Sequence, residues 1–274
     1  VDGGYAGVAG INRDARDIVN TPTILSGDIG AAGDNSDNSY HIMTAGSPTA
    51  GTTLDGLTFT AANAYPWSYS IANQGGGVYC SGGTLAINNC TFTNNAASGG
   101  GGVYFNTAAG SIDNCTFTGN SSYTGNYSGG AIGSSRSTIT VTGSDFTSNT
   151  SFIGGGAISG GSLDIDGCSF SSNNGEAGAI EPDGATTVAN SIFAHNTSRS
   201  YGGAIALIGS TDASMSVAGC TFLQNHAGYY GGAIGGFAGA PVSITTCIFD
   251  GNSGTDGGAL RIAPLSAAPI TCTD

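Results

Sequence analysis

Two short motifs alternate along most of this chain at nearly constant spacing. In the first, a Phe is followed three residues later by an Asn, and successive copies lie 23 to 29 residues apart. The second is a Gly pair followed by two apolar residues, as in Gly-Gly-Val-Tyr at 76–79 and Gly-Gly-Ala-Ile at 129–132. A period of about 20–50 residues is typical of architectures in which one small unit is copied and stacked. This repeat constrains the fold more than any local feature does.

One period, residues 76–98, shows how a single unit is built. Apolar residues at 78–80 form a short run, and residues 84–88 then alternate between apolar and polar. The step from Ile87 to Cys90 is three residues, which breaks the alternation and requires a corner between two strands. Each repeat is therefore predicted to be a coil of three short strands.

A single coil cannot bury its apolar side, whereas stacked coils pair every strand with its equivalent in the next coil. The predicted fold is all-β, a single-stranded parallel β-helix of about ten coils with three short strands in each. We expect one β-helix domain over residues 1–274, with irregular early coils and longer loops in 1–75 and regular repeats in 76–274.

Residues at equivalent positions of stacked coils should form columns inside the helix. The predicted aromatic stack consists of Phe92, Phe117, Phe146, Phe170, Phe193, Phe222 and Phe249. The predicted Asn ladder consists of Asn95, Asn120, Asn149, Asn173, Asn196, Asn225 and Asn252. A third column, two residues before the Phe, holds Cys90, Cys115, Cys168, Cys220 and Cys247. Two interpretations of the Cys column stay open: a metal or redox site, or small buried side chains, a role that free Cys suits well.

The alternation of Gly-Gly-Ala-Ile with Phe-x-x-Asn resembles the repeats of polymorphic outer membrane proteins. The sequences at 2–5, 23–28 and 54–58 are similar to the start of secreted bacterial right-handed β-helix repeat proteins. The resemblance implies a right-handed helix that is secreted or displayed on the cell surface. It implies no single activity, because this fold serves adhesins, passenger domains and polysaccharide-cleaving enzymes.

The charge balance excludes several classes of partner. The 274 residues include five Arg, no Lys and 18 acidic residues, which gives a net charge of −13. Nucleic acid and anionic membranes repel a chain this acidic, so neither is an expected partner. No apolar run approaches the ~18 residues of a membrane span, so we expect no direct membrane insertion.

Carboxylates on an outer face are the candidate catalytic groups, because sugar-cleaving enzymes use paired carboxylates as acid and base. Asp164 and Asp166 share one strand with outward parity, Asp145 lies in the preceding coil, and Arg136 is the nearest basic residue. The alternative is that these Asp residues occupy turns and a solvated surface, where Asp is common. The three His residues share no metal-ligand spacing, so we expect no metal and no cofactor. The sequence favours a protein without catalytic activity.

Aromatic residues gather in the variable loops that precede the Gly-Gly corners. They are Tyr123, Tyr127, Phe152, Tyr201, Tyr229 and Tyr230. Since these loops follow the same corner of successive coils, we expect their rings to line up as an exposed ridge for binding or assembly. The alternative is that each ring packs over its own loop.

These observations favour a secreted or cell-surface structural or adhesive module. Both ends of the chain have repeat-like sequence without an amphipathic helix that would cap an open sheet edge. Since open edges are templates for further strands, we expect either a longer protein or end-to-end self-association into an extracellular filament. The alternative function is a carbohydrate-binding or polysaccharide-cleaving β-helix protein that uses a lateral face, with surface glycans as its partner.

Overall fold

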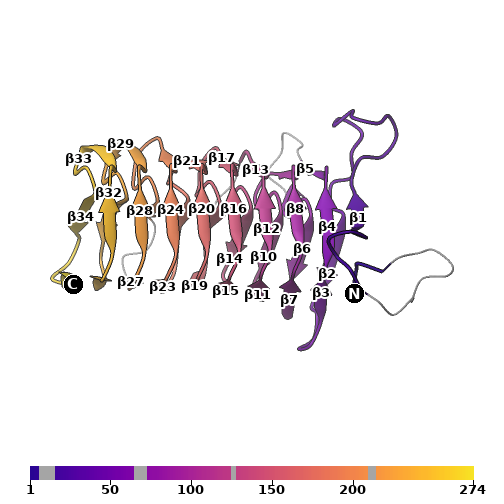
Figure 1. Ribbon diagram of the computed structural model, residues 1–274, viewed down its shortest axis with the longest axis horizontal. Coiled ribbons are helices and arrows are strands. Elements are labelled where there is room, and N and C mark those ends of the chain that lie inside the picture. The colour runs from indigo at the N-terminus through magenta and orange to yellow at the C-terminus, as the bar shows by residue number, and fades with distance from the viewer. Residues whose placement is uncertain (6–15, 65–72, 125–127, 209–213) are drawn as a thin grey trace.

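Each strand pairs in parallel with the equivalent strands of the neighbouring coils, one repeat earlier and one repeat later. The computed structural model describes residues 1–5, 16–64, 73–124, 128–208 and 214–274. In it, Phe117 pairs with Phe92 on one side and with Phe146 on the other. The same pairing continues along the chain and produces the elongated stack of coils in Figure 1, with the two termini at opposite ends.

The strands form four parallel sheets, which we number in the order in which one coil passes through them. Sheet 1 contains β2 (Met43–Gly46), β6 (Val78–Ser81), β10 (Val103–Asn106), β14 (Ile132–Ser135), β18 (Ile158–Ser159), β22 (Ile180–Glu181), β26 (Ile205–Leu207), β30 (Ile234–Ala238) and β34 (Leu260–Pro264). Sheet 2 contains β3 (Thr53–Asp55), β7 (Thr84–Asn88), β11 (Ala109–Asp113), β15 (Thr138–Thr142), β19 (Ser162–Asp166), β23 (Thr186–Ala189), β27 (Met215–Ala218), β31 (Val242–Thr245) and β35 (Ile270–Thr273).

Sheet 3 contains β1 (Thr23–Ser26), β4 (Leu57–Thr60), β8 (Thr91–Thr93), β12 (Thr116–Thr118), β16 (Asp145–Thr147), β20 (Ser169–Ser171), β24 (Ile192–Ala194), β28 (Thr221–Leu223) and β32 (Ile248–Asp250). Sheet 4 contains β5 (Asn63–Ala64), β9 (Ala96–Ala97), β13 (Ser121–Ser122), β17 (Thr150–Ser151), β21 (Asn174–Gly175), β25 (Thr197–Ser198), β29 (His226–Tyr230) and β33 (Ser253–Asp256). The described residues contain no α-helix, so the fold is all-β as the repeat predicts.

A coil has four strands, and the expectation of three was wrong. The strands expected within 76–98 correspond to β6, β7 and β8, while the fourth strand, β9, has only two residues. Two residues are too few to show an alternating pattern, so the signal that reveals the other three strands is missing here. Sheets 1 to 3 have nine strands each and sheet 4 has eight, slightly fewer than the about ten coils expected from the repeat.

Corners between the strands require a left-handed backbone conformation. At the corner between sheets 2 and 3, the residues with a φ of 47° to 62° are Asn89, Asn114, Gly143, Gly167, Asn190, Gly219 and Thr246. Gly and Asn reach this conformation at the lowest cost, which explains why they dominate the corner. His195 has a φ of 57° and occupies the corner between sheets 3 and 4. It is therefore one of the corner residues in which the backbone takes the left-handed conformation.

Phe side chains fill the interior beneath sheet 3. The rings from Phe59 to Phe249 form one stack, with neighbouring centroids 4.7 to 5.0 Å apart and ring planes inclined by only 2° to 9°. Aliphatic side chains of sheets 1 and 2, such as Ile132 and Val141, are buried in the same core. Flat, nearly untwisted sheets are unusual and need stacked side chains to stabilise them. The Phe stack therefore keeps sheet 3 flat.

Candidate functional site

The predicted Asn residues form one continuous hydrogen-bonded ladder from Asn95 to Asn252. In each rung the side-chain amide donates to the Oδ1 of the next Asn and to a backbone carbonyl. For Asn120 these acceptors are Asn149 Oδ1 at 3.0 Å and Phe92 O at 2.9 Å. The backbone N–H of Asn120 also donates to Asn149 Oδ1. Since the polar groups of a rung are paired with one another, the ladder stabilises the fold and is not a binding site.

The Cys column lies inside the corner between sheets 2 and 3. Its members Cys90, Cys115, Cys168 and Cys220 are buried, Cys247 is partly buried, and all five are free thiols. Burial raises the pKa of Cys168 and of Cys220 to about 11, so both thiols are neutral near pH 7 and are poor metal ligands. In the described ranges, no group of three or more His, Cys, Asp or Glu side chains is arranged to hold a metal ion. The geometry favours the interpretation of this column as small buried side chains.

The structure keeps Asp164 and Asp166 on the outer face of one strand but places Asp145 and Arg136 elsewhere. Asp164 and Asp166 point outward from β19 in sheet 2, whereas Asp145 points outward from β16 in sheet 3, around a corner from them. Arg136, with a φ of 50°, lies at the corner before β15, where the strands of sheet 2 begin. Asp166 lies at the other end of these strands. Asp166 accepts a hydrogen bond of 2.8 Å from the side chain of Asn190. Asp145 and Arg136 therefore do not share a face with Asp164 and Asp166, so the four residues do not form one acid–base site with a neighbouring Arg.

A lateral groove of about 510 Å³ crosses sheet 2 and includes Asp164. The hydroxyl groups of Thr187, Ser216 and Ser243 follow Asp164 in register, one coil after another, along the groove. Pro241 belongs to the apolar part of its lining. More than half of the lining residues are Ser or Thr, whose hydroxyl groups donate and accept hydrogen bonds, so this groove is the lateral face that best suits the carbohydrate alternative.

The predicted aromatic ridge is interrupted. Tyr123 and Phe152 directly follow the paired strands β13 and β17, so they occupy equivalent positions, and they are 41% and 60% exposed. The next two coils have Glu176 and Arg199 at this position. The Arg199 guanidinium lies 4.9 Å from the centroid of the Phe152 ring and 3.8 Å from a Glu176 oxygen. Tyr127, the other predicted member of this part of the ridge, lies outside the described residues.

The second aromatic group, Tyr201, Tyr229 and Tyr230, lies near the C-terminal end of the stack. Tyr201 stacks on Tyr230 with ring centroids 5.3 Å apart, and the Phe237 ring meets Tyr230 edge to face at 6.3 Å. The Arg261 guanidinium lies 4.1 Å from the centroid of the Tyr230 ring. These rings pack on one another, and only Tyr229 is largely exposed. Phe237 and Arg261 were not predicted from the sequence, because they lie in strands β30 and β34 of sheet 1 and the aromatic pattern concerned only loops.

Glu181, the last residue of β22, lies on the outer side of sheet 1 and was not predicted from the sequence. The hydroxyl of Ser159 donates a hydrogen bond of 2.8 Å to its carboxylate. Burial raises the pKa of Glu181 to about 7, and the negative charges of Asp183 and Glu176 act in the same direction. The sequence signal that could have revealed Glu181 is a charged residue at a position where neighbouring coils have small residues, namely Gly133, Ser159 and Ala206. The carboxyl group of Glu181 therefore gains or loses its proton near neutral pH.

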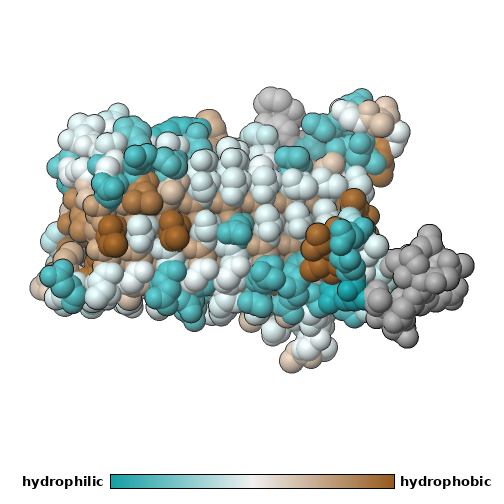
Figure 2. All heavy atoms as spheres, viewed as in Figure 1, coloured by the Kyte–Doolittle hydropathy of each residue, from teal (hydrophilic) through white to brown (hydrophobic). Residues whose placement is uncertain are grey.

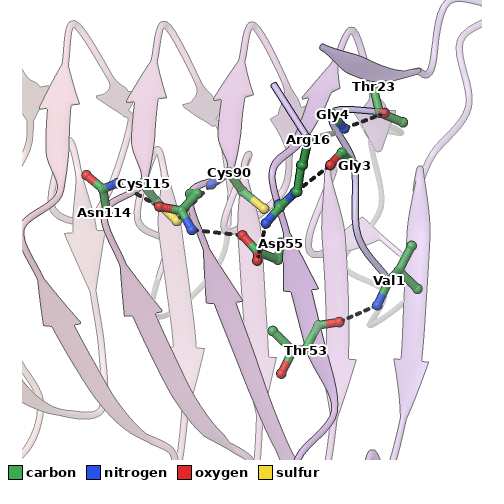
Figure 3. A network of polar contacts seen from close by, with 11 residues as sticks. Val1, Gly3, Gly4, Arg16, Thr23, Thr53, Asp55, Cys90, Asn114 and Cys115 are labelled. Atoms are coloured by element: carbon green, nitrogen blue, oxygen red, sulfur yellow. Dashed lines mark hydrogen bonds and ion pairs between the residues drawn. The ribbon is translucent and has the colours of Figure 1, made fainter. Parts of the chain in front are cut away.

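A polar network fastens the N-terminal segment to the first coils (Figure 3). Arg16 forms an ion pair of 2.7 Å with Asp55 and donates a second bond of 2.7 Å to the carbonyl of Gly3. Asn89 donates to the other oxygen of Asp55 at 2.8 Å, and Asn114 donates to Asn89 at 2.7 Å. The hydrogen bond from Arg16, together with the one from Asn89, holds the pKa of Asp55 below its usual range. The corner Asn residues thus extend the network along the helix.

The comparison with known families agrees with this geometry. Residues 76–260 match the family described as the right-handed β-helix region, which is more than half of the chain, and the chain belongs to this family. The four parallel sheets are accordingly those of a right-handed parallel β-helix. No curated protein and no solved structure is similar enough to this chain to count as a match. In the part of the chain that the structure describes, no helix is long and apolar enough to cross a membrane.

Proposed function

We propose that this protein is a non-catalytic structural or adhesive module of an extracellular or cell-surface assembly, with a repeat related to those of polymorphic outer membrane proteins. The observation that carries the proposal is the uninterrupted Phe stack and Asn ladder, which join each coil to the next along the regular region. A solenoid of this kind has an extended lateral surface, which is what a spacer or display module needs.

Surface labelling of intact cells that make the protein tests its location. An antibody against the folded chain should label unpermeabilised cells, and external protease should remove the signal while a cytosolic marker protein stays intact. Labelling that needs permeabilisation would contradict the proposal.

Self-association is tested by negative-stain electron microscopy over a concentration series. End-to-end association should give filaments with an axial repeat of about 45 Å, since each coil contributes about 4.8 Å. Discrete short rods at every concentration would contradict the filament.

Carbohydrate binding or cleavage is the second candidate function, and the groove on sheet 2 favours it. Incubation with a panel of polysaccharides, followed by assays for bound chain and for released sugar ends, tests this candidate. Activity that is lost in Asp164→Ala and kept in Asp145→Ala, which lies outside the groove, would replace the first proposal. Absence of binding and cleavage by the unmodified chain would remove the second candidate.

A further inference from the structure

The outer face of sheet 3 carries a two-dimensional array of Thr side chains. Strands β4, β8 and β12 share the sequence Thr-Phe-Thr, in which the Phe is buried and both Thr side chains lie on the outer face. With one Thr of β16, they form the threonine array: Thr58, Thr60, Thr91, Thr93, Thr116, Thr118 and Thr147. In-register pairing arranges the array in two rows along the helix axis. Figure 2 shows this face as a regular pale surface over β8 and β12.

The array is periodic in two directions. Along the axis its members follow the strand spacing, and the Phe rings directly beneath are 4.8 Å apart. Across the axis the two Thr residues of one strand are separated by about 6.6 Å, twice the rise per residue. The rings beneath are inclined by only 2° to 4°, so the strands above them form a flat surface. Thr is stiff at its first side-chain torsion, so the array is ordered before anything binds to it.

The array is uncharged, and its hydroxyl groups face solvent. None of them has a hydrogen bond to another residue in the described part of the chain, and none is among the buried unpaired polar atoms. Each Thr presents a hydroxyl that can hold a water molecule beside a methyl group. Toward the C-terminal end, the first charged side chain on this face is Asp145 of β16, which follows Thr116 in register. The row that contains Thr118 ends in the same strand, at Thr147.

The strand propensity of Thr does not by itself explain the array. Sheet 2 has the same parallel pairing, yet one of its outer rows reads Ala86, Ser111, Thr140 and Asp164 in register. Sheet 3 itself continues beyond the array with Ser169 and Ile192. Since the fold accepts many residues at these positions, the regular Thr pattern needs a cause outside the fold.

We propose that the threonine array binds the surface of ice. Water oxygens on a prism face of hexagonal ice form a rectangular lattice. Its repeat is slightly shorter than the strand spacing in one direction and slightly longer than the two-residue rise in the other. An ice face is uncharged and rigid, and the array matches it in both respects. Each bond through a hydroxyl or an ordered water is weak, but bonds between two rigid periodic surfaces form together.

Among the described residues of the N-terminal segment, Ile18 and Val19 border the array at the start of its strands. Ile18 and Val19 lie beside Thr58, and a groove of about 310 Å³ runs between them and the row that includes Thr91 and Thr116. The row with Thr60, Thr93, Thr118 and Thr147 lies on the side of each strand away from Ile18 and Val19, and none of its four residues lines that groove. Substitutions in that row test the proposal most directly.

Ice partition of the purified full chain tests the binding. The chain is mixed with an inert globular protein of similar size, and polycrystalline ice is grown slowly from the solution. The chain should be enriched in the ice by about tenfold over the inert protein, because many weak contacts act together. Exclusion from the ice to the same extent as the inert protein would overturn the proposal.

Matched variants locate the binding face. Thr118→Tyr should reduce the enrichment by about tenfold, because a bulky ring lifts the flat face away from the lattice. Thr140→Tyr places the same ring on sheet 2 and should leave the enrichment unchanged. Equal enrichment of the two variants would overturn the proposal. If circular dichroism shows that Thr118→Tyr does not fold, Thr118→Lys provides the same test with a flexible side chain.

Surface labelling of cells tests the proposed function and does not depend on ice partition. The surface location and the binding of ice can therefore fail separately.

Discussion

The inner and outer faces of sheet 3 follow different rules. Inside, every level from Phe59 to Phe249 has a Phe, and each ring contacts the next. Outside, the Thr array gives way to Asp145 and then to the exposed side chains of Ile192 and Ile248, where Figure 2 shows brown patches over β24 and β32. Inner residues touch their own copies, so packing enforces their repetition. Outer residues have no such constraint, and a regular pattern there points to function.

Phe146→Ala should cause the largest loss of stability. It removes a ring from between Phe117 and Phe170 and leaves a cavity in the stack. We expect the free energy of unfolding to fall by about 4 kcal/mol, measured by denaturant titration. Phe249→Ala, at a partly exposed end of the stack, should cost clearly less. Equal losses at both positions would show that stacking with two neighbours does not determine the inner pattern.

Asn149→Ala should have the next largest effect, about 3 kcal/mol. The substitution removes the acceptor for both donors of Asn120 and the donor to the Phe117 carbonyl, and it leaves these buried groups unpaired. Denaturant titration gives the loss, and hydrogen exchange of the Asn120 backbone amide should become faster. Asn252→Ala removes a partly buried rung and serves as the control. A loss at Asn149 no greater than at Asn252 would mean that the ladder adds little to stability.

Glu181 lies on the outer face of sheet 1, yet its burial should make the stability of the chain depend on pH. Its pKa is raised to about 7 in the folded chain, against about 4.5 when unfolded, so folding favours the protonated form. The contribution of Glu181 to stability should therefore decrease as the pH rises from about 4.5 through 7, by roughly 2 kcal/mol, and level off below that range. Denaturant titration of the chain and of Glu181→Gln at pH 5 and pH 8 isolates this contribution. The variant should lose that part of the pH dependence, and an unchanged dependence would show that Glu181 is well solvated.

Thr93→Val should change stability least, by less than about 0.5 kcal/mol. Val keeps the shape and the strand preference of Thr, and the replaced hydroxyl has no partner among the described residues. The thermal midpoint and a denaturant titration measure the change. A loss above about 1 kcal/mol would give the array a packing role and remove the contrast between the two faces.

Sequence alone could predict what the coils share with one another. The Phe and Asn positions recur because each side chain contacts its own copy, and the three-residue step between Ile87 and Cys90 marks a corner that the structure places at Asn89. Sheet 4 escaped prediction because its strands are mostly two residues long, and the pairing of β5 with β9 depends on the backbone of neighbouring coils.

Features outside the repeat were harder to predict. The aromatic loops share a corner, but the position of each ring depends on unrelated neighbours, such as Arg199 over Phe152 and Arg261 over Tyr230. The pKa of Glu181 depends on how deeply the surrounding loops bury it, and no period in the sequence reports that depth. Repetition predicts contacts between copies, and it says little about contacts that occur once.

The Asn ladder gives the molecule an electrical direction. From Asn95 to Asn225, each side-chain amide donates one hydrogen to the Oδ1 of the next Asn, toward the C-terminal end, and the other to a Phe carbonyl of the preceding coil. Each Oδ1 from Asn120 onward accepts from the Asn on its N-terminal side, so these side-chain carbonyls point the same way. Aligned hydrogen bonds polarise one another in a low-dielectric interior. The Oδ1 atoms of the ladder therefore all face the N-terminal end of the stack, so a second ladder placed head to tail would continue this direction and one placed head to head would reverse it.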